Sequence, residues 1–144
     1  MRIVIVGAGK AGAFLAARLL PEHEVTLIEQ RHERVERVRT MLPDANVIEG
    51  DACEPDVLER AGLQGADMLV ASTGDDEDNL VVAMLAQNYA VDRVIARVNH
   101  PANEWLFDKE WGVDVAMSAP AVLWGIVEQQ CEVPPAPLIE TNGA

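Results

Sequence analysis

The chain has 144 residues, a formal net charge of −13 at pH 7 and a hydrophobic content of 49%. This length suits one globular domain and leaves no room for a nucleotide-binding domain followed by a separate substrate domain. The acidic balance argues against nucleic acid or an anionic membrane surface as a direct partner, because both require basic patches. No run approaches the roughly 20 apolar residues of a membrane span, so we expect a cytoplasmic protein without direct membrane insertion.

Cysteine and histidine are too scattered to indicate a metal centre or a disulfide framework. Cys53 and Cys131 stand far apart, and neither has metal-ligand spacing around it. His23, His32 and His100 share no such spacing either, and we expect them at the surface.

The first 29 residues have the order of strand, glycine turn, helix, strand and acid that a dinucleotide-binding βαβ unit requires. An apolar strand over 2–6 leads into Gly-Ala-Gly-Lys-Ala-Gly at 7–12, and a helical pattern covers 10–20. A second strand over 24–29 ends at Glu29, 22 positions after Gly7, near the roughly 20 expected for an acid that holds ribose hydroxyls. We therefore predict a nucleotide site, with a glycine turn that serves only packing as the alternative.

Short apolar runs alternate with helical patterns along the rest of the chain, which predicts a parallel sheet covered on both faces. Further strands are expected near 46–49, 67–71, 93–97 and 113–116, and helices near 31–41, 54–60, 76–89, 101–110 and 119–130. The predicted fold class is α/β, a single-domain Rossmann-type doubly wound parallel sheet of strand order 3-2-1-4-5-6. This domain occupies 1–130, and the proline-rich residues 131–144 are expected to form a tail or a linker to a further lobe.

Each glycine of the loop has its own expected role. Gly7 permits the tight turn, Gly9 lets the backbone approach a pyrophosphate, and Gly12 lets the helix pack closely on the sheet. The N–H groups that open the helix, together with the helix dipole, favour a phosphate there. Lys10 can reach that phosphate or remain a solvated surface lysine. Glu29 can accept hydrogen bonds from ribose hydroxyls, or it is a plain exposed acid at a strand end.

Polar residues also follow the later strands, where a ligand is expected. Asp51 can accept a hydrogen bond from an adenine amino group or cap the next helix. Residues 72–74 (Ser-Thr-Gly) follow the fourth strand beside the expected pyrophosphate, and Asn79 can orient that loop. Arg97, inside an apolar run, needs either a ligand phosphate or a structural acid as its partner. The predicted cofactor-binding residues are Gly7, Ala8, Gly9, Lys10, Ala11, Gly12, Glu29, Gln30, Asp51, Ala52, Cys53, Ser72, Thr73, Gly74, Asn79 and Arg97.

Taken together, these stretches resemble a known family. It is the RCK N-terminal (KTN, TrkA-N) nucleotide-binding domain of regulators of Trk- and Ktr-type potassium uptake systems and of potassium channels. The matching segments are 6–12, 49–52, 57–62, 66–68, 72–80, 95–99 and 112–115, in family order and covering nearly all of the chain to about residue 130. This combination is far more specific than the glycine motif alone.

The resemblance implies that NAD(H), ATP or ADP binds as a gating signal, and that the chain is not an enzyme and has no catalytic residue. Under this likeness the loop 7–12 cradles the phosphates, Glu29 lies by the ribose and Asp51 by the adenine. Residues 72–73 lie by the diphosphate, and Arg97 lies at the far end of the ligand.

Two positions bear on which ligand the resemblance implies. Some Ktr-type relatives carry an arginine at the position of Lys10 that meets the ATP γ-phosphate of a neighbouring subunit, which favours ATP slightly. Relatives often have an acid after the proline at position 120, where this chain has Ala121, so we expect no bound divalent metal.

The implied partner is a membrane potassium transporter or channel subunit, which would hold the protein at the inner face of the cell membrane. The apolar segment 119–130 predicts a homodimer, which could also form part of a larger ring. The alternative is that this segment packs against the sheet of its own chain. Trp105, Trp111 and Trp124 are expected to be core or interface anchors. Ligands with different phosphate ends would then stabilise different angles between the dimer halves.

Two enzyme classes are the competing interpretations. An NAD-dependent oxidoreductase would need a substrate domain, and Tyr89 lacks the lysine four residues later that short-chain reductases use. An S-adenosylmethionine-dependent methyltransferase could also use the glycine loop, the strand-two acid and the Gly-Asp-Ala at 50–52. Against it, Gly12 leads directly into a helix suited to pyrophosphate.

Overall fold

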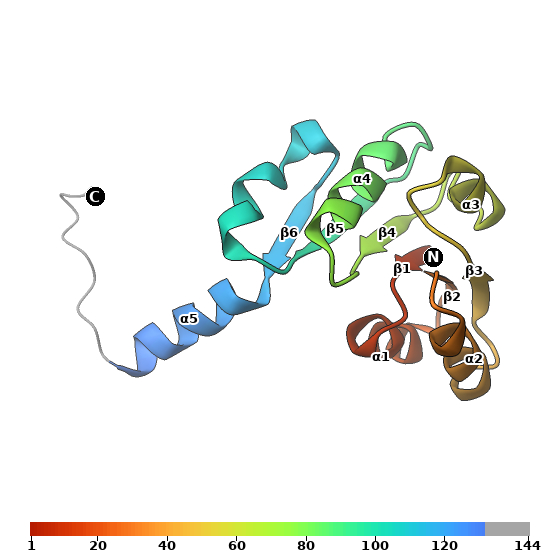
Figure 1. Cartoon of the computed structure of the whole chain (residues 1–144), viewed down its shortest axis with the longest axis horizontal. Coiled ribbons are helices and arrows are strands. Elements are labelled where there is room, and N and C mark those ends of the chain that lie inside the picture. Colours follow the sequence, from red (N-terminus) through yellow and green to blue (C-terminus); the bar gives the residue numbers. More distant parts are fainter. Residues whose placement is uncertain (132–144) are drawn as a thin grey trace.

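The computed structural model describes residues 1–131, so the predicted tail lies outside the described residues except for Cys131. Six parallel strands form one sheet in the order β3-β2-β1-β4-β5-β6, which confirms the predicted fold class (Figure 1). The strands are β1 (Arg2–Val6), β2 (Glu24–Glu29), β3 (Asn46–Glu49), β4 (Met68–Ala71), β5 (Arg93–Val98) and β6 (Val115–Ser118). The helices are α1 (Lys10–Leu19), α2 (His32–Met41), α3 (Pro55–Arg60), α4 (Asp76–Ala86) and α5 (Ala119–Gln130), with 3₁₀ helices η1 (Pro101–Leu106) and η2 (Lys109–Trp111).

The two faces of the sheet are covered by different helices because right-handed crossovers reverse direction at β1. On one face α1 and α2 bury a cluster that includes Ala16, Val35 and Val38. On the other face α3, α4 and the segment 101–113 bury a larger cluster, in which Leu58 and Leu69 are fully buried. The switch between β1 and β4 places the carboxyl ends of both strands beside the start of α1, which is where a doubly wound fold binds its ligand.

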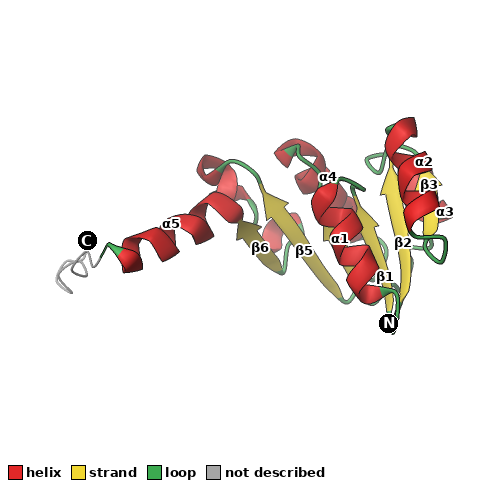
Figure 2. Cartoon of the chain, turned by 90° about the horizontal axis from the view of Figure 1, so that it is seen from below, coloured by secondary structure: helices red, strands yellow, loops and turns green. Residues whose placement is uncertain are grey.

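One part of the sheet has no helix over it. On the face shared with α1 and α2, no helix of the described residues covers β6, and Val115 and Met117 are 45% and 44% exposed (Figure 2). The last helix, α5, extends away from the body instead of folding back, and all of its large apolar side chains are exposed. Among the described residues, no helix is both long enough and apolar enough to cross a membrane.

Three predicted elements differ in extent from those of the structure, two of them because a side chain bonds to the backbone. The helix expected over 101–110 is two 3₁₀ turns, since the Asp108 carboxylate accepts the N–H groups of Glu110 and Trp111 and so starts a new turn. The sixth strand begins at Val115 rather than at 113, because the Asp114 carboxylate takes the N–H of Val94 before the ladder starts. The fourth helix ends at Ala86 and not at 89, where a turn leads to Ala90 in the left-handed region (φ 53°).

The tryptophans are not part of the core. Trp105, Trp111 and Trp124 are 75%, 37% and 60% exposed. The core alternative predicted for them was therefore wrong, and the interface alternative remains a prediction.

At Gly12 the first turn of α1 lies close against the backbone that follows β1. A Cβ atom at this position would overlap the carbonyl oxygen of Gly7, which is backbone and cannot swing aside. The start of α1 can therefore lie against the end of β1 only because position 12 has no side chain.

We predict that Gly12→Ala lowers the free energy of unfolding by about 1–3 kcal/mol or more, since overpacking outweighs the roughly 0.5–1 kcal/mol that alanine gains over glycine in a helix. Gly125→Ala is the matched control, because Gly125 is also helical but has no atom within 4 Å of an added Cβ. Urea denaturation of both variants checks this. Equal stability of the two variants would contradict the close approach at Gly12.

Candidate nucleotide-binding site

A pocket of about 770 Å³ lies along the carboxyl ends of the strands. It extends from the end of β2 past the glycine loop to the junction of β6 and α5. Thirteen of the sixteen predicted site residues line it, which are Gly7, Gly9, Lys10, Ala11, Glu29, Gln30, Asp51, Ala52, Cys53, Ser72, Thr73, Gly74 and Arg97. The other three, Ala8, Gly12 and Asn79, are buried behind the lining.

The start of α1 supplies unused hydrogen-bond donors to this pocket. The N–H groups of residues 9–12 form no hydrogen bond with any atom of residues 1–131, whereas Ala13 already donates to the carbonyl of Gly9. A helix start leaves such donors free, and the helix dipole adds partial positive charge. Residues 9, 10 and 11 line the pocket, so the arrangement suits an anion with several oxygen atoms.

Glu29 is held in a fixed orientation at the end of β2. It is only 6% exposed, and its two carboxylate oxygens accept the N–H of Ala8 at 2.8 Å and the N–H of Arg31 at 3.0 Å. Arg34 lies 3.8 Å from the carboxylate. A carboxylate has about four acceptor positions, so Glu29 can still accept hydroxyl donors from the pocket.

The turn after β3 contributes acceptors and a protonated thiol. The Asp51 carboxylate accepts the N–H of Cys53 at 2.9 Å, and the residue at the N-cap of α3 is Glu54. The alternative that Asp51 caps this helix was therefore wrong. Burial, with the carboxylates of Asp78 and Asp51, raises the pKa of the Cys53 thiol to about 12. Cys53 consequently remains a thiol at neutral pH and is unsuited to nucleophilic chemistry.

The hydroxyl groups after β4 are already used within the protein. Ser72 donates its hydroxyl to the carbonyl of Val6 at 3.0 Å. The Thr73 hydroxyl lies 2.7 Å from the Asn79 amide oxygen and 3.1 Å from the carbonyl of Asp75. Since a hydroxyl has one hydrogen, these two side chains present acceptors and not donors to the pocket. Among the described residues, the N–H of Gly74 has no hydrogen-bond partner.

Cations lie on two sides of the pocket. Lys10 stands at the glycine loop, and Arg97 is a half-buried residue at the end of β5. Within residues 1–131, no carboxylate lies within ion-pair distance of either one. The structural-acid alternative for Arg97 was therefore wrong, which leaves its guanidinium available to a ligand. In the same part of the chain no group of three metal-ligating side chains occurs.

Comparison with known proteins identifies the family. Residues 3–119 match the TrkA-N domain. This chain belongs to the TrkA-N domain family. It is 43% identical over 131 residues to the Trk system potassium uptake protein TrkA of Mycobacterium tuberculosis, an alignment that covers 90% of this chain and 59% of that protein. The chain thus spans less than two thirds of this relative, which is named for potassium uptake and not for an enzymatic activity, as predicted.

Solved structures agree with this assignment. The TrkA-N domain of the Escherichia coli inner membrane protein ybaL has a TM-score of 0.79 at 19% identity, over 90% of this chain and 95% of that one, and shares the fold. The structure of GsuK bound to ADP has a TM-score of 0.73 at 27% identity, over 91% of this chain and 34% of that one.

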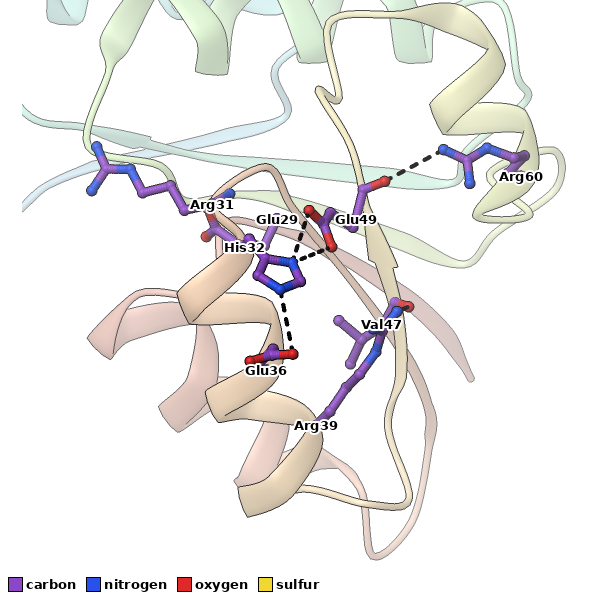
Figure 3. A network of polar contacts seen from close by, with 8 residues as sticks. All are labelled: Glu29, Arg31, His32, Glu36, Arg39, Val47, Glu49 and Arg60. Atoms are coloured by element: carbon purple, nitrogen blue, oxygen red, sulfur yellow. Dashed lines mark hydrogen bonds and ion pairs between the residues drawn. The ribbon is translucent and has the colours of Figure 1, made fainter.

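Sequence reasoning missed a contact that braces one end of the pocket of this TrkA-N domain. His32, at the start of α2, lies 3.1 Å from the Glu49 carboxylate at the end of β3 and 3.3 Å from Glu36 (Figure 3). The bond joins the turn after Glu29 to the turn before Asp51. Glu29 and Glu49 are partners in the parallel register. The predicted strand order could therefore have indicated that the start of α2 lies close to the end of β3.

The hydrogen bond to Glu49 is the main cause that raises the pKa of His32 above 6.5. A histidine whose pKa is raised on folding stabilises the fold below its unfolded pKa, and this stabilisation is lost as the pH rises through its folded pKa. We predict that NMR titration places the pKa of His32 above 6.5 and that Glu49→Gln lowers it. A pKa of His32 that is unchanged in Glu49→Gln would contradict the brace.

Proposed function

We propose that this TrkA-N domain is a nucleotide-sensing regulatory domain that binds NAD(H), ATP or ADP and gates a membrane potassium transporter or channel. The observation that carries the proposal is the set of unused N–H groups at residues 9–12, at the start of α1, where residues 9–11 line the pocket. The ADP bound to GsuK, a relative of the same fold, supports a ligand of this class.

The pocket matches an adenine nucleotide along its length. The free amides of 9–12 and the ammonium of Lys10 would hold the phosphates, since charge-assisted hydrogen bonds are the stronger ones. Glu29 would accept the ribose hydroxyls, with Asp51 beside the adenine. Arg97 would meet the far end of the ligand. The volume of about 770 Å³ lies within the roughly 300–1,000 Å³ of small-molecule sites.

Glu29 favours NAD over NADP, because its buried carboxylate would repel a 2′-phosphate. Arg34 reduces this preference, since its guanidinium lies 3.8 Å from the carboxylate and could accept such a phosphate.

A homodimer would cover the apolar surface that a single chain leaves exposed. Val115 and Met117 on the open face of the sheet, and the apolar residues of α5, need a partner of similar character. A second copy supplies both surfaces at once through a two-fold axis. Met117 and Ala119 also line the far end of the pocket, so a ligand that reaches them would bias the position of α5 and the angle between subunits.

Membership of the TrkA-N family is the basis for proposing a membrane partner and a location for this domain. A transporter or channel subunit of the membrane would receive the change in dimer angle, which would place the domain at the inner face of the membrane. The regulatory ligand would be bound and released unchanged, so no side chain needs to transfer a proton or a hydride.

Isothermal calorimetry with NADH, ATP, ADP and S-adenosylmethionine tests the ligand class. We expect saturable binding of at least one adenine nucleotide. Arg97→Ala should lower the affinity for the nucleotide that binds most tightly by about tenfold or more, since a hydrogen bond to a charged group contributes roughly 1.5–3 kcal/mol. Arg93→Ala, at the exposed opposite end of the same strand, is the control and should leave affinity unchanged. No binding at millimolar concentration, or a preference for S-adenosylmethionine, would overturn the proposal.

Sedimentation velocity at micromolar concentration tests the assembly. We expect a dimer that Leu123→Glu on α5 dissociates, because the new charge would be buried in an apolar interface. Met41→Glu on α2 is the matched control, since Met41 and Leu123 are 60% and 61% exposed. A wild-type protein that sediments mainly as a monomer would contradict the homodimer.

A further inference from the structure

Asn79 lies on α4, behind the wall of the pocket, and its side chain is completely buried. A buried primary amide is costly unless its hydrogen-bonding capacity is used. Every hydrogen bond of the Asn79 side chain goes to one of two neighbouring segments, which are the loop after β4 and the end of β5.

The amide makes four short contacts with these two segments. Its oxygen accepts the N–H of Thr73 at 3.0 Å and lies 2.7 Å from the Thr73 hydroxyl. Its nitrogen donates to the carbonyl of Thr73 at 3.0 Å and to the carbonyl of Arg97 at 2.9 Å. One side chain therefore fixes both peptide groups of Thr73 and ties them to the residue that carries the far cation of the pocket.

The groups that would meet a ligand follow directly from these fixed atoms. The carbonyl of Thr73 belongs to the same peptide unit as the N–H of Gly74, which lines the pocket and has no partner within residues 1–131. Peptide planarity means that holding the carbonyl oxygen also sets the direction of that N–H. In the same way, the bond to the carbonyl of Arg97 holds the backbone from which the guanidinium extends.

We propose that Asn79 is a positioning residue for the distal phosphate of the ligand, an inference that rests on the proposed nucleotide binding. It does not touch the ligand. It aims the N–H of Gly74 and the side chain of Arg97 at one point, where the second phosphate of a nucleoside diphosphate lies. Preorganised donors of this kind gain affinity because they need no rearrangement when the anion binds.

Asn99 supports the same peptide group from the other side. Its amide nitrogen donates to the carbonyl of Thr73 and to the Asp76 carboxylate, both at 3.0 Å. Burial acts to raise the pKa of Asp76, but hydrogen bonds from the 99–103 segment outweigh it and hold the pKa below its usual value. Asp76 thus remains a carboxylate that anchors Asn99, and the carbonyl of Thr73 has two amide donors.

The test compares ADP with AMP, which differ only in the distal phosphate. We expect the wild-type protein to bind ADP more tightly than AMP. Asn79→Ala should lower the affinity for ADP by about tenfold, equivalent to roughly 1.4 kcal/mol. It should lower the affinity for AMP by much less. A purely structural role would weaken both ligands by the same factor, and that result would overturn the inference.

Two further variants make the result specific. Asn99→Ala removes one of the two donors to the Thr73 carbonyl and should give a smaller loss of the same kind, which keeps the test available if Asn79→Ala does not fold. Asn103→Ala removes only a bond to Asp76, at 2.9 Å, and should leave the ratio of ADP to AMP affinity unchanged. If the ratio of ADP to AMP affinity in Asn99→Ala equals that of the wild type, this result would also count against the inference. Failure of the wild-type protein to bind ADP and AMP while it binds NADH or ATP would overturn this inference alone, whereas failure to bind any of these nucleotides would refute the proposed function.

Discussion

The close approach of Gly12 to the carbonyl of Gly7 is the constraint on which the site depends. It places the first turn of α1 directly beyond the end of β1, so that the unpaired N–H groups of residues 9–12 lie beside the pocket. Any side chain at position 12 would push the helix away and turn these donors from the site. Glu29 completes the arrangement, because its carboxylate holds the N–H of Ala8 and fixes the first half of the loop.

A protein with a net charge of −13 can still favour an anion at this place. Charges farther away than a Debye length, about 8 Å at physiological ionic strength, are largely screened. The charges close to the pocket therefore determine whether an anion is attracted to it. Lys10, Arg97 and the start of a helix contribute positive charge there.

The sequence was sufficient for the sheet order and for most residues that line the pocket, because both follow from local signals. The glycine spacing, the apolar runs and the acid at the end of β2 each act within one βαβ unit. The features that it did not predict depend on hydrogen bonds between distant residues. The Asp114 carboxylate accepts the N–H of Val94 just before β6 begins, and His32 at the start of α2 meets Glu49 at the end of β3. Asn79 could be predicted near the site, but its place behind the wall depends on the end of β5, 18 residues away.

The most direct test of the account is the response of the backbone amides to ADP in ¹H–¹⁵N NMR spectra. If the N–H groups of residues 9–12 and 74 bind the phosphates, their signals should shift most on titration, and adenosine should leave them nearly unmoved. Large shifts confined to other parts of the chain, with residues 9–12 unchanged at saturation, would contradict the claim that the start of α1 holds the ligand.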